Sequence, residues 1–473
     1  MPDNGYEVVI GLECHVQLAT RSKMFCGCAS DYAGAAPNTH VCPICLGMPG
    51  VLPVMNRVAV EYTLLTGLAL NADIPEATKF DRKNYPYPDL VKGYQISQYD
   101  LPLVKGGWLE ISSDGSGTRR IELERVHLEE DTGKLTHVPG GSLIDFNRSG
   151  VPLMEMVSKP EIRSPGEARA YLLKLRAILR TLGVSDADME KGQLRCDVNV
   201  SLRPVGETRL GTKVEVKNLN SFRSVQRALE FEIARQTELL ERGEAIQQET
   251  RGWVDDRGVT VSQRSKEEAH DYRYFPEPDL PPVFVERAWL EDLRRRLPEL
   301  PGARRARYME AFGLGDYDAE LLSTDLWAAR LFEQTTTAGA DPKKAANWIQ
   351  NDVARLRTDG EPSLSPNNLA ELIRLVDQGV IGISTARQLL ATVCETGKAP
   401  RVLVDELGLA QVSDSSALEE AVRAAIEANP AAVADYRSGK ATAINFLKGQ
   451  VMKTTRGKAN PATAEELLKN LLA

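Results

Sequence analysis

The chain of 473 residues lacks any apolar run of the roughly 18 residues that a membrane-spanning helix requires. Its first residues, MPDNGYEVVIG, do not show the basic-then-apolar order of a secretory signal peptide. It contains only seven cysteines, too few to staple a secreted chain of this length with disulfides. We therefore expect a cytoplasmic protein that has no membrane association, and the length predicts more than one domain.

Two further absences narrow the chemistry. The pattern GxxxxGK[ST] of a phosphate-binding Walker loop does not occur. The sequence also shows no evident cysteine–histidine pair and no Ser-Ser-Lys arrangement, so a free-standing glutamine-hydrolysing amidase has no support. The formal net charge of −8 excludes a protein coated in basic surface. A local basic patch could still bind nucleic acid.

Four of the seven cysteines gather in two short motifs, CGC at 26–28 and CPIC at 42–45. Four thiolates at this spacing suit tetrahedral zinc and leave no open position for catalysis. The pattern predicts a structural zinc site on the loop 26–45, formed by Cys26, Cys28, Cys42 and Cys45. The alternative is two unrelated pairs of free cysteines.

The segment VVIGLECHVQL at 8–18 alternates between apolar and polar residues. A period of two predicts a strand that has one buried face. Glu13 and His15 then project side by side from the other face, where they could share a cation. Alternatively, they are ordinary polar residues of an exposed strand face.

The stretch from His127 to Glu161 carries the most acid in an apolar setting. Glu129, with Glu130 and Asp131 after it, closes one segment, and Glu155 lies inside PLMEMV of the next. A carboxylate among such neighbours is costly unless a cation or dense hydrogen bonding compensates. The polar loop DFNRSG joins the two segments, and the arrangement suits Mg²⁺ bridging to phosphates. The alternative is a surface hairpin with one salt-bridged glutamate.

Two more segments, 193–204 and 213–222, repeat the strand alternation. Their polar faces carry Asp197 and Glu215, which extends an acidic sheet face. Helices are predicted at 56–70, 165–182 and 222–242, the second beginning with Ser164-Pro165. The pattern indicates an α+β fold in which an antiparallel sheet carries helices on one side.

Two irregular stretches are rich in basic and aromatic residues. Residues 79–100 and 248–282 are predicted to be loops, suited to hold phosphate or a terminal nucleotide, with a solvated loop as the alternative for the first. The second is too long for a plain connection in a compact domain and contains Trp253, Tyr272 and Tyr274, so we expect it to be functional.

Strand patterns end near PEPDLPP, and helical patterns follow from about residue 288. A last helical region from about residue 401 carries a basic cluster with little acid nearby: Lys440, Lys448, Lys453, Arg456 and Lys458. This cluster makes RNA a plausible ligand on an otherwise acidic chain, and a solvated basic helix is the alternative.

Many separate motifs closely resemble the B subunits of the heterotrimeric tRNA-dependent amidotransferases, GatCAB. They span nearly the whole chain and are VVIGLECHVQL, KFDRKNYPYPDLVKGYQISQYD, HLEEDTGKL, DFNRSGVPLMEMVSKPE, LRCDVNVSLRP, KVEVKNLNSF, QETRGW, DYRYFPEPDLPP, LPELPGARRARYMEAFGL, KKAANWI and FLKGQVMKTTRGKANP. The resemblance implies a glutamine-synthetase-like antiparallel-sheet cradle over residues 1–290. A helical tRNA-binding domain over 291–400 and a helical tail that contacts tRNA over 401–473 would follow.

The resemblance implies a ligase that uses ATP and Mg²⁺ to phosphorylate the side-chain carboxylate of Glu-tRNA(Gln), Asp-tRNA(Asn) or both. Ammonia released from glutamine by an A subunit then displaces the phosphate, and a small C subunit wraps the A–B interface. A non-catalytic tRNA-binding scaffold of the same complex is the alternative function. A scaffold has no need for carboxylates in an apolar setting, whereas a Mg·ATP site does.

The resemblance also assigns roles by motif position. His15, Glu129 and Glu155 match Mg²⁺ ligands. A second cation position corresponds to Glu13, Asp197 and Glu215, with Glu129 shared. Lys92 falls where the family lines its ammonia channel, and the four clustered cysteines match a zinc site that some members have.

Overall fold

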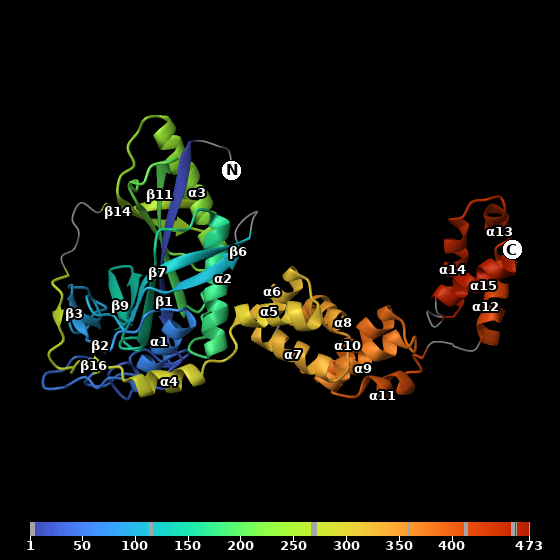
Figure 1. Ribbon diagram of the computed structural model, residues 1–473, viewed down its shortest axis with the longest axis horizontal. Coiled ribbons are helices and arrows are strands. Elements are labelled where there is room, and N and C mark those ends of the chain that lie inside the picture. Colours follow the sequence, from blue (N-terminus) through green and yellow to red (C-terminus); the bar gives the residue numbers. More distant parts are fainter. Residues whose placement is uncertain are drawn as a thin grey trace. The chain divides into compact units, whose positions relative to one another are not determined.

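The computed structural model describes residues 5–112, 117–265, 272–357, 360–410, 415–455, 459 and 461–472. The chain divides into two compact units, residues 1–301 and 302–473 (Figure 1). Each unit is described by itself. None of the helices in the described ranges combines the length and the apolar character that crossing a bilayer would require.

The first unit is built on a nine-stranded sheet, counted over the described residues, with the order β14-β13-β12-β11-β1-β10-β7-β5 and β6 paired to β7. Its strands are β1 Tyr6–Gln17, β5 Val104–Lys105, β6 Trp108–Ser112, β7 Thr118–Glu130, β10 Pro152–Ser158, β11 Leu194–Pro204, β12 Val214–Lys217, β13 Glu249–Val254 and β14 Val259–Ser265. The expectation of a purely antiparallel sheet is wrong at one pairing, because β12 and β13 run parallel. The helix α3 (Phe222–Glu241) crosses over between them, and only such a crossover allows parallel neighbours.

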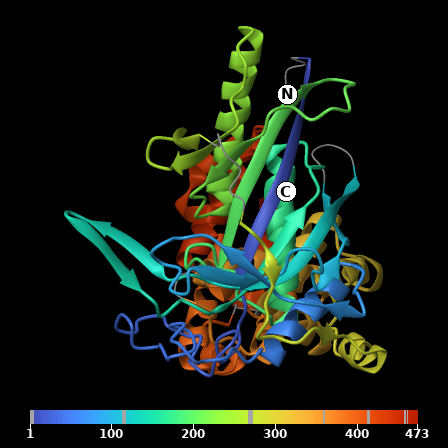
Figure 2. The ribbon, with the colours of Figure 1, turned by 90° about the vertical axis from the view of Figure 1, so that its left-hand side faces the viewer.

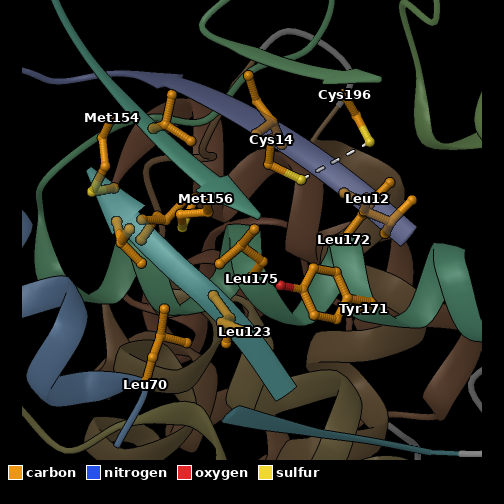
Figure 3. Packing of buried hydrophobic residues seen from close by; sticks show 14 of the residues in the cluster. Leu12, Cys14, Leu70, Leu123, Met154, Met156, Tyr171, Leu172, Leu175 and Cys196 are labelled. Atoms are coloured by element: carbon orange, nitrogen blue, oxygen red, sulfur yellow. Dashed lines mark hydrogen bonds between the residues drawn. The ribbon is translucent and has the colours of Figure 1, made fainter. Parts of the chain in front are cut away.

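The predicted alternation separates a buried face of the sheet from a polar one. On β1, Leu12, Cys14 and Val16 are almost fully buried, while their neighbours in sequence are half-exposed. Cys14 lies opposite Cys196 of β11, and their sulfur atoms point toward each other 3.9 Å apart (Figure 3). The strands predicted at 8–18, 193–204 and 213–222 are therefore present, and their polar residues share the opposite face.

Helices cover the buried face, and side-chain caps explain where they begin. Ser164 accepts a hydrogen bond from the backbone amide of Glu167 at the start of α2 (Pro165–Leu182), and Gly183 ends it in the left-handed conformation. Ser221 caps α3 in the same way. The side chain of Asn56 caps α1 (Arg57–Ala69), which confirms the third predicted helix. Leu172 and Leu175 of α2 pack in the same core as the strand side chains (Figure 3).

Short strands at the edges correct the two predicted loops. The stretch 79–100 contains β3 (Asp81–Asn84) and β4 (Tyr94–Ser97), which form a small sheet with β15 (Phe275–Pro276). The stretch 248–282 contains the hairpin of β13 and β14, and its residues 266–271 lie outside the described ranges. Few of its residues are branched and aliphatic, which hid the strands. Gly258, with φ of +63°, serves the turn between them.

Two further hairpin-like pairs complete the unit. β2 (Ala77–Thr78) pairs with β16 (Val283–Phe284). β8 (Lys134–Val138) and β9 (Gly141–Asp145) form a mostly exposed hairpin that projects from the body of the unit (Figure 2). The short helix α4 (Arg287–Arg295) places Leu293 in the main core.

The second unit is helical, as predicted, and has no strand in its described residues. Its helices are α5 Pro301–Phe312, α6 Asp316–Thr324, α7 Leu326–Thr337, α8 Pro342–Asn347, η1 Trp348–Val353, η2 Ala354–Leu356, α9 Pro366–Asp377, α10 Ile383–Thr396, α11 Pro400–Glu406, α12 Ser415–Ala428, α13 Pro430–Arg437, α14 Ala443–Thr454 and α15 Pro461–Leu472. They form two hydrophobic clusters. One runs from Tyr308 to Val404 and therefore includes α11, and the other runs from Leu418 to Leu472.

Candidate active site and cysteine site

The register of three neighbouring strands brings the acidic residues together on the polar face of the sheet. His15 of β1 lies directly opposite Glu155 of β10, and Glu155 lies opposite His127 of β7. Two residues along β10, Leu153 lies opposite Glu129. Directly opposed residues in a sheet share a face, so these side chains from distant parts of the sequence converge.

The resulting cluster is tight and largely dry. The Nδ1 atom of His15 lies 3.4 Å from a carboxylate oxygen of Glu129 and 3.9 Å from one of Glu155. Its Nε2 atom lies 3.5 Å from Glu13. On the other side, Nε2 of His127 lies 3.4 Å from Glu155. Two triads of candidate ligands thus share Glu155, and the ligand atoms within each lie within 4.8 Å of one another.

Burial and mutual charge set the protonation of this cluster. Desolvation, reinforced by Glu129, raises the pKa of Glu155 to about 8. Burial opposes charge on His15, but hydrogen bonds with Glu129 and Glu13 raise its pKa well above the usual value. Burial likewise opposes charge on Glu129, yet the His15 contact lowers its pKa to about 2. Desolvation lowers the pKa of His127 to about 4, so this ring is neutral at pH 7. The cluster therefore holds protons where a cation could replace them.

We expect the affinity for a divalent cation to depend on pH. Because the pKa of Glu155 is raised to about 8, a cation must displace its proton below that pH. Affinity should therefore rise as the pH increases from about 6 to 8 and level off above the pKa. Titration of the full-length chain with Mn²⁺, followed by electron paramagnetic resonance at several pH values, measures this. Glu155→Gln has no proton to displace and should flatten the profile, and an equally steep profile in that variant contradicts the assignment.

The cluster opens into a pocket of about 390 Å³. His15 and Glu129 line one part of it. The rest is lined by cations, amides, an aromatic ring and backbone-near polar groups: Lys83, Tyr85, Gln95, Asp131, Thr132, Arg195, Asp197, Lys217, Asn218 and Asn220. A pocket that presents carboxylates on one side and cations on the other suits a polyanion held partly through divalent cations.

Lys83 supplies the most distinctive of these cations. Its ammonium lies over the ring of Tyr272, 4.9 Å from the centroid, and within the described residues it has no carboxylate at ion-pair distance. Although burial opposes charge, Glu129 and Glu155 raise its pKa. A charged lysine held between aromatic rings and a carboxylate cluster can meet an incoming anion.

The four clustered cysteines form a second candidate site. Ligand atoms of Cys26, Cys28, Cys42 and Cys45 all lie within 4.8 Å of one another, so the residues fit tetrahedral zinc. A hydrogen bond from Cys26, opposed by burial, lowers the pKa of the Cys45 thiol to about 5. Desolvation raises the pKa of Cys28 to about 11. One sulfur is therefore already a thiolate, and a bound metal would take the remaining protons' places.

Comparison with known proteins assigns the chain. Residues 8–291 match the GatB/GatE catalytic domain, and residues 330–472 match the GatB domain. The chain belongs to the GatB family. It is 52% identical to the B subunit of the aspartyl/glutamyl-tRNA(Asn/Gln) amidotransferase of Carboxydothermus hydrogenoformans over 99% of both chains. The corresponding B subunit of Moorella thermoacetica is 54% identical over 99% of this chain and 100% of its own.

Not every residue singled out in the sequence joins the carboxylate cluster of this GatB family member. Asp197 lies opposite Glu13, but its carboxylate pairs with Lys217 at 2.5 Å. Glu215 lies 3.3 Å from the same lysine and accepts a hydrogen bond from Thr250. Among the described residues, neither takes part in a group of three close ligands. Their role at a second cation position stays a prediction.

Lys92 lies in a different cavity from the carboxylate cluster. Its ammonium pairs with Glu130, and both line a space of about 140 Å³ together with Cys26 and Cys45. Asp131, which follows Glu130, pairs with Arg195 at 2.7 Å. Two of the three adjacent acids at the end of β7 are thus neutralised by their own partners, and Glu129 alone joins the cluster.

Sequence reasoning missed His127, Lys83 and Arg195 as site residues. His127 precedes Glu129 by two positions on a strand, so the alternation used for Glu13 and His15 could have identified it. Arg195 alternates with Asp197 in the same way. Lys83 had no such signal, because the short strand β3 was interpreted as loop.

The basic cluster of the last region is less free than its sequence indicated. Lys440 pairs with Asp435, and Lys448 pairs with Glu465, so acid does lie nearby. Lys453 is exposed at the end of α14. Arg456 and Lys458 lie outside the described residues.

Proposed function

We propose that the chain is the subunit of a tRNA-dependent amidotransferase that carries out ATP-dependent activation and amidation. It phosphorylates the side-chain carboxylate of Glu-tRNA(Gln), of Asp-tRNA(Asn) or of both, and ammonia then displaces the phosphate to leave the amide. The observation that carries this proposal is the buried group of Glu129, Glu155 and His15 beside a cation-lined pocket. A scaffold that only binds tRNA would gain nothing from such costly burial of acid.

Phosphoryl transfer between two anions requires positioning and charge neutralisation more than covalent help. Mg²⁺ bound at His15, Glu129 and Glu155 would supply a Lewis acid that bridges the phosphates of ATP. The neutral His127 contacts Glu155 from the side away from His15 and holds that carboxylate in place. Strand backbones on both sides fix the three ligands, so little reorganisation is needed when the nucleotide binds.

The cations of the pocket complete the anion site. Lys83, Arg195 and Lys217 face the same space as His15 and Glu129. They can neutralise the remaining phosphate charge and the substrate carboxylate, which approach each other against their mutual repulsion. Arg195 is oriented by Asp131, and Lys217 by Asp197. The attack on the activated carboxyl then needs ammonia in its neutral form, because ammonium has no free electron pair.

The resemblance and the names of the relatives support partner subunits, a glutaminase A subunit and a small C subunit. Co-expression of the chain with candidate A and C subunits tests the proposed function. We expect amidation of Glu-tRNA(Gln) or Asp-tRNA(Asn), assayed separately, to require ATP, Mg²⁺, glutamine and this chain together. ATP hydrolysis that appears without any charged tRNA, or amidation that proceeds without this chain, contradicts the proposal.

We also propose that the last helical cluster contributes to tRNA binding. Truncation after Leu409 leaves α11 packed in the preceding cluster, where Val404 is fully buried. We expect the truncated chain to bind Glu-tRNA(Gln) more weakly and with a shallower dependence on salt, because fewer phosphate contacts release fewer counterions. Filter binding at several salt concentrations measures both. Identical slopes for the two chains contradict a role of this cluster in binding.

A further inference from the structure

Lys23 is one of the most completely buried side chains of the first unit, and it is charged. It is 1% exposed, next to the loop that carries the four cysteines. Within the described residues, no carboxylate lies at ion-pair distance from its ammonium. Burial of an uncompensated charge costs several kcal/mol, so its neighbours must compensate it in another way.

The neighbours of the ammonium are two backbone carbonyls and one sulfur. The Nζ atom donates to the carbonyl of His40 at 2.7 Å and to that of Phe146 at 3.4 Å. It lies 3.7 Å from the sulfur of Cys45. Carbonyl oxygens are only partial charges, so the cysteine sulfur is the one contact that can carry a full negative charge.

The cysteine site has the matching deficit. Four thiolates around Zn²⁺ leave a net charge of −2, and the backbone amide of Cys42 already donates to the Cys45 sulfur at 3.1 Å. A cation at the same sulfur lowers the net charge of the centre and reduces the basicity of that thiolate. The burial of Lys23 and the charge of the site therefore compensate each other.

The same side chain lies where the cysteine loop meets the catalytic sheet. The backbone amide of Met24 donates to the carbonyl of Gly150, just before β10. Gly150 has φ of +84°, and a Cβ there would lie 3.5 Å from the stem of Lys23 and 3.6 Å from Cys45. The loop that leads to Glu155 thus packs directly on this lysine.

We propose that Lys23 is a positioning residue of the cysteine site: its buried ammonium neutralises the Cys45 thiolate and fastens the zinc loop to the loop before β10. The inference rests on the proposed zinc site. It goes beyond it by assigning the stability of the centre to a lysine that is not a ligand.

The test compares Lys23→Met, which keeps the apolar stem and removes the charge, with Lys23→Arg, which keeps the charge, in the full-length chain. Lys159→Met, at an exposed ion pair with Glu122, is the matched control. Zinc content is measured by mass spectrometry, and zinc release is followed as transfer to the chelator 4-(2-pyridylazo)resorcinol. We expect Lys23→Met to release zinc about 10- to 100-fold faster than the wild type, and Lys23→Arg and the control to stay close to it.

A second measurement separates charge from mere packing. In the cobalt-substituted chain, loss of the cation should shift the sulfur-to-cobalt charge-transfer band of Lys23→Met to lower energy, because the thiolate becomes richer in electrons. A band at the wild-type energy overturns the proposal even when release is faster, since the variant has then only loosened the loop. Should Lys23→Met fail to fold, Lys23→Gln, which can still donate to a carbonyl, carries the same comparison.

The outcomes also separate this inference from the zinc site on which it rests. A wild-type chain that contains no zinc overturns the site and the inference together. A wild-type chain that holds one zinc, with equal release rates and equal bands in Lys23→Met, overturns the role of Lys23 and leaves the site in place.

Discussion

Glu129→Gln should reduce ATP hydrolysis that depends on Glu-tRNA(Gln) by about 1,000-fold or more while leaving tRNA affinity nearly unchanged. Glutamine keeps the shape of the side chain but cannot supply the negative charge that a divalent cation requires. The loss of one charged ligand at a catalytic cation costs several kcal/mol, and about 4 kcal/mol corresponds to roughly 1,000-fold in rate. Glu129 is 3% exposed, so water cannot take over its role.

The measurement is a phosphate-release assay with the assembled complex and charged tRNA, together with filter binding of the same tRNA. Glu155→Gln should behave in the same way, because both carboxylates lie close to the same His15 nitrogen. Glu122→Gln is the matched control, since Glu122 lies on the same strand β7 with its side chain half-exposed and paired to Lys159. Wild-type hydrolysis in Glu129→Gln and Glu155→Gln would remove the assignment of the site, and a parallel loss of tRNA binding would point to misfolding.

The double variant Cys42→Ser/Cys45→Ser should lose its bound zinc and a large part of the stability of the first unit. Structural zinc supplies binding energy that becomes folding energy, about 10 to 16 kcal/mol in small zinc-binding peptides. Here the metal orders one loop of a unit that has a large core of its own, so a fraction of that energy is expected. A loss of about 3 kcal/mol corresponds to a fall in Tm of roughly 6 °C or more.

Zinc per chain and the thermal midpoint measure this effect, and limited proteolysis should show new cleavage between residues 26 and 47. Cys394→Ser, a partly buried cysteine of α10 outside the cluster, is the control and should keep both zinc and Tm. Full zinc occupancy in the double variant would refute the assignment. Because the loop packs on Gly150, just before β10, the double variant should also bind Mn²⁺ more weakly at the carboxylate cluster.

Local patterns were sufficient for much of this molecule. The alternation in β1 predicted that Glu13 and His15 share a face, and they lie 3.5 Å apart. Capping residues placed the ends of α2 within the predicted range, because a serine followed by proline specifies a helix start through contacts only three residues away. The spacing of the four cysteines predicted a cluster, and their sulfur atoms do lie together.

Long-range pairings were beyond those patterns. No local signal distinguished Glu129, which joins the cluster, from Glu130 and Asp131, which are neutralised by Lys92 and Arg195. The parallel pairing of β12 and β13 depends on where α3 returns the chain, and strand alternation is the same in either direction. The buried lysine at the cysteine loop also had no signal, since its carbonyl partners lie up to 123 residues away.

The sequence by itself determined which residues could share a face, where helices begin and which family the chain resembles. These properties depend on neighbours within a turn or a strand, and physical chemistry fixes them locally. Only the tertiary structure decided which acids meet, because the register between β1, β7 and β10 sets His15 against Glu155 and Glu155 against His127. A shift of one residue in either pairing would turn these side chains into the core, so the burial of the opposite face holds the site together.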